Sequence, residues 1–227
     1  MLVYGKNVFK ELPIEQIIKV YLSNQFNDIK ILNRLKDKEI VKVSKRELDQ
    51  MTKGNHQGIV LEISDYNYYE LNDLLKKDNP FLVMLDHLED PHNFGAIIRS
   101  CEAAGVDGII IAKNRSVTVN STVMKVSAGA LAKTKVAMVT NLVSTIKKLQ
   151  DQGFTIIGTD MQGTDYKTID YQNKICLVIG NEGKGMSRLV RENVDLIATI
   201  PMKGTINSLN ASVATAIVVF EASYQRK

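Results

Sequence analysis

The feature of this sequence that most constrains its fold is a regular series of short apolar runs between Phe81 and Ile200. Helix-like stretches lie between several of these runs, which is typical of a parallel sheet covered by helices on both faces. Ligands of such sheets bind outside the carboxyl ends of the strands. We therefore expect an α/β domain whose site lies where the apolar runs end. The runs cover 81–85, 108–111, 136–139, 154–158, 175–179 and 196–200, and the main helical stretches cover 94–104, 142–150 and 209–224.

The amino-terminal part of the chain follows a different pattern. Ser44 and Glu47 have the spacing of a capping box, which predicts a short helix that continues through Met51. Strand-like runs cover 17–22, 40–43 and 58–63, and a stretch of helical spacing covers 27–35.

A polar stretch from Asp65 to Asn72 separates the two patterns. We expect a small α/β domain over residues 1–66, a linker over 67–79 and a larger α/β domain over 80–227.

Composition restricts the class of protein. Hydrophobic residues make up 44% of the chain and charged residues 24%, which is ordinary for a globular protein. The longest apolar run, 211–220, is about half the roughly 20 residues that a membrane span needs, and no signal peptide is recognisable. Cys101 and Cys176 stand far apart, as buried cysteines of a reducing compartment do. We expect a cytoplasmic protein. The net charge of +4 is compatible with a polyanionic partner but does not locate one.

The first segment with unusual polar residues runs from Leu85 to Arg99. It leaves a strand, crosses a polar loop and enters a helix for which Pro91 and Asn93 are start signals. Arg99 lies roughly opposite the apolar face of this helix, so it is either a solvated surface charge or a group that points into a cleft. The apolar face itself consists of Phe94, Ile97, Ile98 and Cys101.

The same loop also contains possible metal ligands. Their spacing matches no helical pair of histidines, and no distant cluster of ligands completes the set. We expect no metal site, and acidic groups near a helix N-terminus are the better interpretation. The possible ligands are Asp86, His87, Glu89, Asp90 and His92.

The second segment, 177–187, is a strand followed by a glycine-rich loop and a helix that Ser187 caps. Its glycines are spaced G-x-x-G-x-G, so neither the dinucleotide-binding fingerprint nor the P-loop pattern is present. Such a loop is either a tight turn or a place where a ligand approaches the backbone closely. Glu182 lies inside the loop, where a carboxylate at the end of a strand is well placed for chemistry.

The third segment, 200–214, leaves a strand at Pro201, and Ser208 or Asn210 caps the final helix. This helix is apolar nearly all round, so it is either a plain core helix or the contact surface of a symmetric homodimer.

Taken together, the three segments resemble the three motifs of the SpoU/TrmH family of the SPOUT superfamily, which contains RNA ribose 2′-O-methyltransferases. The whole chain is similar to RlmB-like members, which methylate a guanosine of large-subunit ribosomal RNA. The motifs are matched by residues 90–99, by 179–183 with Gly185, and by 200–202 with 208–210, and shorter signatures by 3–5, 56–58 and 126–130. Mild departures are Phe94, Asn7 and Lys135, none of which is a polar catalytic position.

The resemblance implies properties that spacing alone does not show. It implies a SPOUT-type knotted parallel-sheet catalytic domain with a deep trefoil knot, S-adenosyl-L-methionine as cofactor, and a homodimer formed through the knotted domain. It also implies that the small amino-terminal α/β domain is L30e-like and binds RNA, and we expect ribosomal RNA.

The resemblance also assigns roles to individual residues. The catalytic residues it implies are Asn93, Arg99, Glu182, Ser208 and Asn210. The cofactor-binding residues are Thr159, Asp160, Gly180, Ile200, Met202 and Leu209, which contribute mostly backbone groups. Lys113, Arg115 and Arg188 are candidates for contacts with RNA phosphates.

The implied reaction is a displacement in which a ribose oxygen attacks the methyl group of a sulfonium ion. The family description makes Arg99 the group that activates the hydroxyl, but arginine almost never loses its proton. We therefore hypothesise that Arg99 stabilises negative charge that develops on the oxygen, with Asn93 as an orienting group. Glu182 or solvent then takes part in removing the proton.

Three alternatives remain at this point. A nonenzymatic RNA-binding or ribosome-assembly protein would not bind the cofactor tightly. A nucleotide-dependent enzyme would need the fingerprint that the glycine-rich loop lacks. Within the family, transfer RNA competes with ribosomal RNA as the substrate, although the folded amino-terminal domain favours ribosomal RNA.

Overall fold

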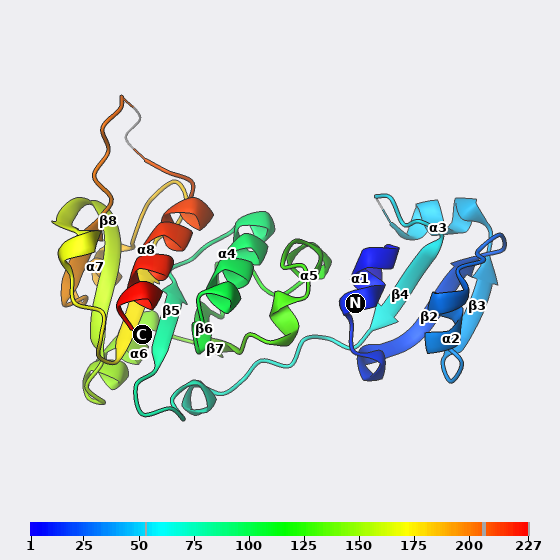
Figure 1. The fold of residues 1–227 in the computed structure, drawn as a ribbon, viewed down its shortest axis with the longest axis horizontal. Coiled ribbons are helices and arrows are strands. Elements are labelled where there is room, and N and C mark those ends of the chain that lie inside the picture. Colours follow the sequence, from blue (N-terminus) through cyan, green and yellow to red (C-terminus); the bar gives the residue numbers. More distant parts are fainter. Residues whose placement is uncertain (53, 206–207, 227) are drawn as a thin grey trace.

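The structure is a computed structural model that describes residues 1–52, 54–205 and 208–226. Two α/β units lie side by side, each with its own sheet, and an extended segment joins them (Figure 1).

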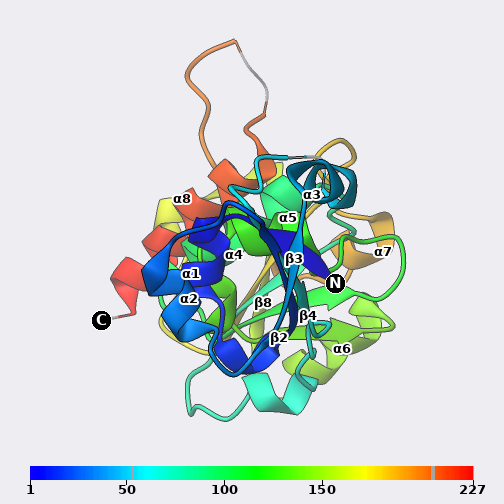
Figure 2. The same ribbon diagram turned by 90° about the vertical axis from the view of Figure 1, so that its right-hand side faces the viewer.

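The smaller unit has a four-stranded sheet in the order β1-β4-β2-β3. Its elements are β1 (Leu2–Tyr4), α1 (Lys6–Glu11), β2 (Ile17–Ser23), α2 (Ile29–Arg34), β3 (Glu39–Val43), α3 (Lys45–Met51) and β4 (Ile59–Ile63). Val20 and Leu22 of β2 are fully buried against Phe9 of α1 and Ile31 of α2. The helices α1 and α2 therefore cover one face of the sheet, and α3 lies on the other side (Figure 2).

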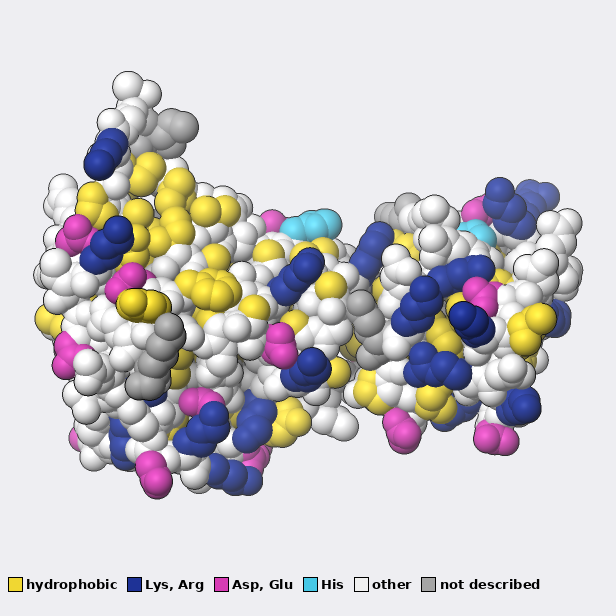
Figure 3. Space-filling view, in the orientation of Figure 1, with side chains coloured by type: hydrophobic (Ala, Val, Ile, Leu, Met, Phe, Trp, Pro, Cys, Tyr) yellow, Lys and Arg dark blue, Asp and Glu magenta, His cyan; other side chains and the backbone are white. Residues whose placement is uncertain are grey.

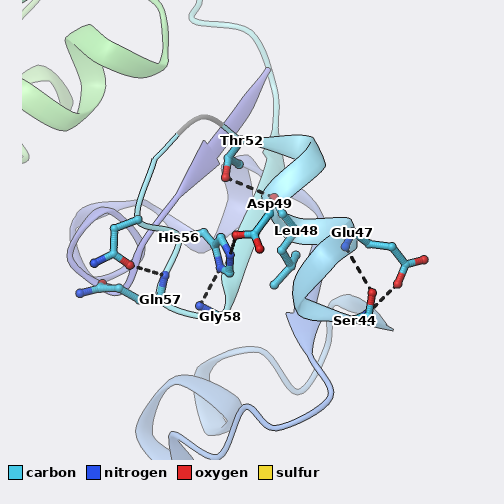
Figure 4. Close-up of polar contacts among 9 residues, drawn as sticks. Ser44, Glu47, Leu48, Asp49, Thr52, His56, Gln57 and Gly58 are labelled. Atoms are coloured by element: carbon cyan, nitrogen blue, oxygen red, sulfur yellow. Dashed lines mark hydrogen bonds and ion pairs between the residues drawn. The ribbon is translucent and has the colours of Figure 1, made fainter.

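Local hydrogen bonds fix the start of α3 and the loop that follows the helix. The predicted capping box is confirmed, since the Ser44 hydroxyl accepts from the Glu47 amide and the Glu47 carboxylate accepts from the Ser44 amide (Figure 4). The imidazole of His56 is buried, with its Nδ1 accepting from the Gly58 amide and its Nε2 3.0 Å from the Asp49 carboxylate. This part of a family signature thus has a structural role, because it shapes the turn into β4.

The larger unit has a six-stranded sheet in the order β10-β8-β9-β5-β6-β7, in which every described pairing is parallel. Its strands are β5 (Phe81–Leu85), β6 (Gly108–Ala112), β7 (Val136–Val139), β8 (Thr155–Asp165), β9 (Ile175–Ile179) and β10 (Leu196–Thr199). Its helices are α4 (Pro91–Ala103), α5 (Ser121–Val126), α6 (Leu142–Gln150), α7 (Arg188–Arg191) and α8 (Ala211–Gln225), and short 3-10 turns include Leu71–Leu74 and Ala130–Ala132. The expected α/β fold with a parallel sheet is confirmed.

Helices cover both faces of this sheet, as the apolar runs predicted. One core contains residues of α4, α5 and α8, and a second core contains residues of α6 and α7. The helices α8, α1 and α2 lie on one side of the molecule, and α6 and α7 lie on the other (Figure 2). Phe94, Ile97, Ile98 and Cys101 of α4 are fully buried, which confirms the predicted apolar face.

Of the two caps predicted for the final helix, the structure has Asn210, whose side chain accepts from the amides of Ser212 and Val213. The structure differs from the sequence-based predictions in two places. Ser187 precedes α7, but its side chain makes no capping hydrogen bond. The strand β8 extends to Asp165 because its polar end pairs with β10.

The two units touch through a small contact. Met124 of α5 packs against the cores of both units. The ammonium group of Lys125 lies 5.6 Å from the centre of the Tyr4 ring, across the boundary between the units. Over the described residues, none of the helices combines the length and the apolar character that crossing a bilayer requires.

Candidate active site

The candidate site lies at the carboxyl ends of β5, β9, β8 and β10, which are neighbours in the sheet. After β5 the chain turns into α4, whose first turn is capped by the Asp90 carboxylate and begins with Pro91. The cap accepts from the amides of His92 and Asn93 at 3.0 and 3.4 Å. This turn holds Asn93 in a fixed position, with its side chain 8% exposed at the edge of the sheet.

Three of the predicted catalytic side chains form one chain of hydrogen bonds. The Asn93 amide nitrogen Nδ2 donates to Glu182 Oε1 at 3.1 Å. The Asn210 amide nitrogen donates to Asn93 Oδ1 at 2.9 Å. The residues of this chain are separated by 89 and 117 positions in the sequence, so only the fold brings the three motifs together.

The glycine-rich loop that carries Glu182 is tied down at both ends. Near its start, the Asn181 amide nitrogen donates to the carbonyl of His87 at 2.8 Å, and Asn181 pairs through its backbone with Gly185. At its end, the Ser187 amide donates to Asp86 Oδ2 at 2.6 Å. Both ties lead back to the residues that follow β5, and they fix the loop relative to α4.

Asp86, which the sequence indicated only as a possible metal ligand, is a buried carboxylate that is 1% exposed. Its other oxygen lies 2.6 Å from Nδ1 of His87. A buried carboxylate needs hydrogen-bond partners, and these two contacts give one to each oxygen of Asp86. Asp86 thus supports the loop from below and does not line the cavity above it.

A cavity of about 790 Å³ opens above the strand ends. This volume lies within the range of about 300–1,000 Å³ that is typical of sites for small molecules and cofactors. All six residues predicted to bind a cofactor line it, as do Glu182 and Ser208. The shared lining residues are Thr159, Asp160, Gly180, Ile200, Met202, Leu209, Glu182 and Ser208.

Backbone and side-chain contacts set the shape of this cavity. A Cβ atom on Gly180 would overlap the backbone of Gly185 and Met186, so the loop can close on itself only at a glycine. The Thr159 hydroxyl donates to the carbonyl of Val178, and the Asp160 carboxylate pairs with the guanidinium of Arg191. The cavity therefore has a fixed acidic group on one wall.

The predicted basic residues are not drawn into the cavity. Arg99 is exposed on α4, outside the cavity lining, and no ion pair of it is found among the described residues. Lys113 and Arg115 are exposed in the loop after β6, where Arg115 has a positive φ of 52°. Arg188 is exposed and pairs with Glu192 one turn later at 2.9 Å.

The structure also identifies residues that the sequence reasoning did not assign. Asn181 and Asp86 position the glycine-rich loop. The available signal was weak: Asp86 directly follows a fully apolar strand, and such positions carry functional side chains in parallel sheets.

Other reactive groups do not form a second centre in the described part of the chain. No group of three or more His, Cys, Asp or Glu side chains is arranged to hold a metal ion in residues 1–52, 54–205 and 208–226. Burial raises the pKa of the Cys101 and Cys176 thiols far above the ordinary value. Both cysteines therefore behave as core residues.

The chain matches two family models that together cover most of its length. Residues 80–220 match the SpoU rRNA Methylase family, and residues 2–69 match a family described as RNA 2′-O ribose methyltransferase substrate binding.

Individual proteins are similar to the chain over similar lengths. A protein of Bacillus subtilis, whose curated name places it among TrmH family tRNA/rRNA methyltransferases, is 44% identical over 81% of this chain and 76% of its own length. A Staphylococcus aureus protein of the same description is 42% identical over 94% of this chain and 90% of its own. The crystal structure of an AdoMet-bound rRNA methyltransferase from Sinorhizobium meliloti superposes with a TM-score of 0.83, at 27% identity, over 98% of this chain and 86% of that one.

Proposed function

The chain belongs to the SpoU rRNA Methylase family, and we propose that it methylates the 2′-hydroxyl of a guanosine ribose in large-subunit ribosomal RNA. The observation that carries the methyl-transfer part of this proposal is the hydrogen-bonded chain of Glu182, Asn93 and Asn210 at the rim of a cofactor-sized cavity. The choice of a guanosine in large-subunit ribosomal RNA is supported by the similarity of the sequence to RlmB-like proteins. A polar constellation held this firmly is preorganised for chemistry at the strand ends.

S-adenosylmethionine is the cofactor, and when bound it supplies a methyl group activated by attachment to a positively charged sulfur. We propose that Thr159, Gly180, Ile200, Met202 and Leu209 hold it, because they line the cavity from three strand ends and the segment before α8. The carboxylate of Asp160 is suited to polar hydroxyl or amino groups of the cofactor, and its pairing with Arg191 fixes its direction.

The side chains of the hydrogen-bonded chain then act on the ribose. The two hydrogen bonds that Glu182 accepts, from the Asp90 amide and from Asn93, both use Oε1. We infer that Oε2 accepts the proton of the ribose hydroxyl while Asn93 keeps the carboxylate in place. The attacking oxygen gains a bond to the methyl carbon, the carbon–sulfur bond breaks, and its electron pair remains on sulfur.

Arg99 has a separate part in this proposal. A guanidinium stays charged, so Arg99 stabilises negative charge on the ribose oxygen and does not remove the proton. Because Arg99 is exposed and lies outside the cavity lining, we propose that it reaches the ribose from outside the cavity. Replacing Arg99 with alanine should lower turnover by about 10²–10³-fold, the usual loss when one charge-stabilising donor is removed. Turnover equal to the wild type would refute this role.

The larger-scale features that the resemblance implies are also proposals. We infer a trefoil knot in the carboxyl-terminal part, an L30e-like fold for the small domain, and the division 1–66, 67–79 and 80–227. We also infer a homodimer, because α8 exposes the apolar side chains of Val213 and Phe220 at 48% and 49%. Hydrophobic side chains gather on this face of the larger unit (Figure 3).

The choice of RNA can be tested with methyl-labelled S-adenosylmethionine. The protein is incubated with unmodified large-subunit ribosomal RNA and, separately, with total transfer RNA, and labelled nucleosides are identified by mass spectrometry. We expect labelled guanosine from ribosomal RNA and none from transfer RNA. Label in transfer RNA alone would replace ribosomal RNA as the substrate, and tight RNA binding without transfer or cofactor binding would favour a nonenzymatic RNA-binding protein.

A further inference from the structure

The helices α1 and α2 of the small domain hold basic side chains in fixed positions on one surface. The Lys6 ammonium lies 5.2 Å from the centre of the Phe26 ring, and the Arg34 guanidinium lies 4.8 Å from the centre of the Phe9 ring. Arg34 also donates to the backbone carbonyls of Lys10 and Leu12. These contacts reduce the side-chain freedom that a cation must lose when it binds an anion.

The same surface carries further cations. Lys10 and Lys30 are exposed on α1 and α2, and no ion pair of either is found among the described residues. The Asp28 carboxylate at the start of α2 lies 3.0 Å from the Lys6 ammonium, and the hydrogen bond from Lys6 lowers the pKa of Asp28. Lys and Arg side chains gather across the front of the small domain (Figure 3).

The basic surface continues onto the larger domain. Lys125 of α5 is exposed and stands over the ring of Tyr4, at the boundary between the domains. The helix α5 packs closely on α4, where a Cβ atom on Gly95 would meet the side chain of Val126. Since α4 carries both Asn93 and Arg99, Lys125 lies between the basic surface of the small domain and the candidate active site.

The two basic helical surfaces of the small domain face different sides of the molecule. The helices α1 and α2 lie on the same side of the molecule as α8, which packs against α4 (Figure 2). Lys45 and Arg46 lie on α3, across the sheet from α1 and α2. On α4 itself the carboxylate of Glu102 is matched by Lys133 at 3.6 Å.

We propose that Lys10, Lys30 and Arg34 on the small domain and Lys125 on the larger domain form one continuous surface for the RNA sugar–phosphate backbone. This surface leads from α1 and α2 across α5 to Arg99, so both domains bind the same RNA at once. The inference rests on the proposed function for the nature of the RNA. Phosphate contacts of this kind fix the register of RNA without reading its sequence.

The test compares charge reversals on the two sides of the small-domain sheet. The double variant K10E/K30E changes α1 and α2, and K45E/R46E makes the same charge change on α3 as a matched control. The variant K125E tests the continuation onto the larger domain. Thermal unfolding of each variant confirms that it folds. The RNA is an unmodified transcript of large-subunit ribosomal RNA, and the measured quantities are its Kd at several salt concentrations, the Kd for S-adenosylmethionine, and KM and kcat for methyl transfer.

Binding should weaken in both surface variants and remain near the wild-type level in the control. The slope of log K against log salt should become shallower by about two for K10E/K30E and by about one for K125E, since each phosphate contact contributes roughly one. KM for RNA should rise at least about tenfold in K10E/K30E, with kcat at saturating RNA and the cofactor Kd unchanged. A loss confined to K45E/R46E would overturn the proposed surface, and unchanged binding by K125E would overturn its continuation onto the larger domain.

The RNA-binding readout also separates this inference from the proposed function. If the wild type binds the transcript through α1 and α2 but transfers no methyl group, the proposed activity fails and the surface stands. If methyl transfer occurs and K10E/K30E has wild-type KM and salt dependence, the surface fails and the activity stands.

Discussion

Removing the carboxylate of Asp86 should loosen the glycine-rich loop and weaken cofactor binding. Asp86 is 1% exposed, and its oxygens make hydrogen bonds of 2.6 Å with the Ser187 amide and with Nδ1 of His87. Hydrogen bonds to a charged group contribute about 1.5–3 kcal/mol each, and relief from burying a charge offsets part of their loss. We therefore expect Asp86→Ala to lower the free energy of unfolding of the larger domain by about 3 kcal/mol.

The conservative replacement Asp86→Asn separates the effect of losing the hydrogen bonds from the effect of losing the charge. In Asp86→Asn the amide oxygen still accepts from Ser187, and the amide nitrogen donates to Nδ1 of His87 when that atom carries no proton. The expected loss is then only about 1 kcal/mol. Urea unfolding followed by circular dichroism measures both variants, and isothermal titration measures cofactor affinity, which should fall about tenfold in Asp86→Ala. The reasoning is refuted if Asp86→Ala unfolds like the wild type, or if both variants lose the same stability.

Three further substitutions test the residues of the candidate site itself. Glu182→Gln keeps the acceptor for Asn93 but removes the proposed base, so turnover should fall by about 10²–10⁴-fold while cofactor affinity, measured by titration, stays the same. Gly180→Ala places a Cβ atom against the backbone of Gly185 and should raise the cofactor Kd, whereas an unchanged Kd would show that the loop adapts. Asn210→Ala removes the cap of α8 and the hydrogen bond to Asn93. Thermal unfolding should show that the free energy of unfolding falls by about 1 kcal/mol, and the methyl-transfer assay should show a lower kcat. Wild-type values in both measurements would contradict the roles of the cap and of the hydrogen bond.

The strands of the larger domain could be predicted because each one contains a run of apolar residues. Burial of such a run on both faces leaves few alternatives, as the complete burial of β5, β6 and β9 illustrates. The sequence contains no comparable apolar run for elements whose stability depends on contacts with distant residues. The strand β1 has three residues and α1 has six, and both are stabilised by the burial of Val3 and Phe9 in the core of the small domain.

The polar end of β8 illustrates a second limit. Residues after Gly158 show no strand-like alternation, and their extended form depends on backbone pairing such as that of Thr164 with Ala198. The main-chain groups that form these hydrogen bonds are carried by every residue except proline, so a sequence pattern does not reveal the pairing.

The sequence was sufficient to predict which segments form the candidate site, but not which side chains contact one another there. Spacing alone placed Glu182 at a strand end and left the role of Arg99 open, and only the family resemblance connected the three motifs. The partner of Asp86 is 101 positions away at Ser187, which no local rule indicates. The structure therefore adds two findings: Asp86 holds the glycine-rich loop in place, and Arg99 lies outside the cavity.

The central claim, methyl transfer to a ribose oxygen, is tested most directly by alkaline hydrolysis of the labelled product. A 2′-O-methyl group removes the nucleophile that cleaves the neighbouring phosphodiester bond in alkali. RNA labelled by the wild-type protein should therefore release its label in an alkali-resistant dinucleotide, and Arg99→Ala should give little of that product. Label released in mononucleotides would place the methyl group on a base and contradict the account.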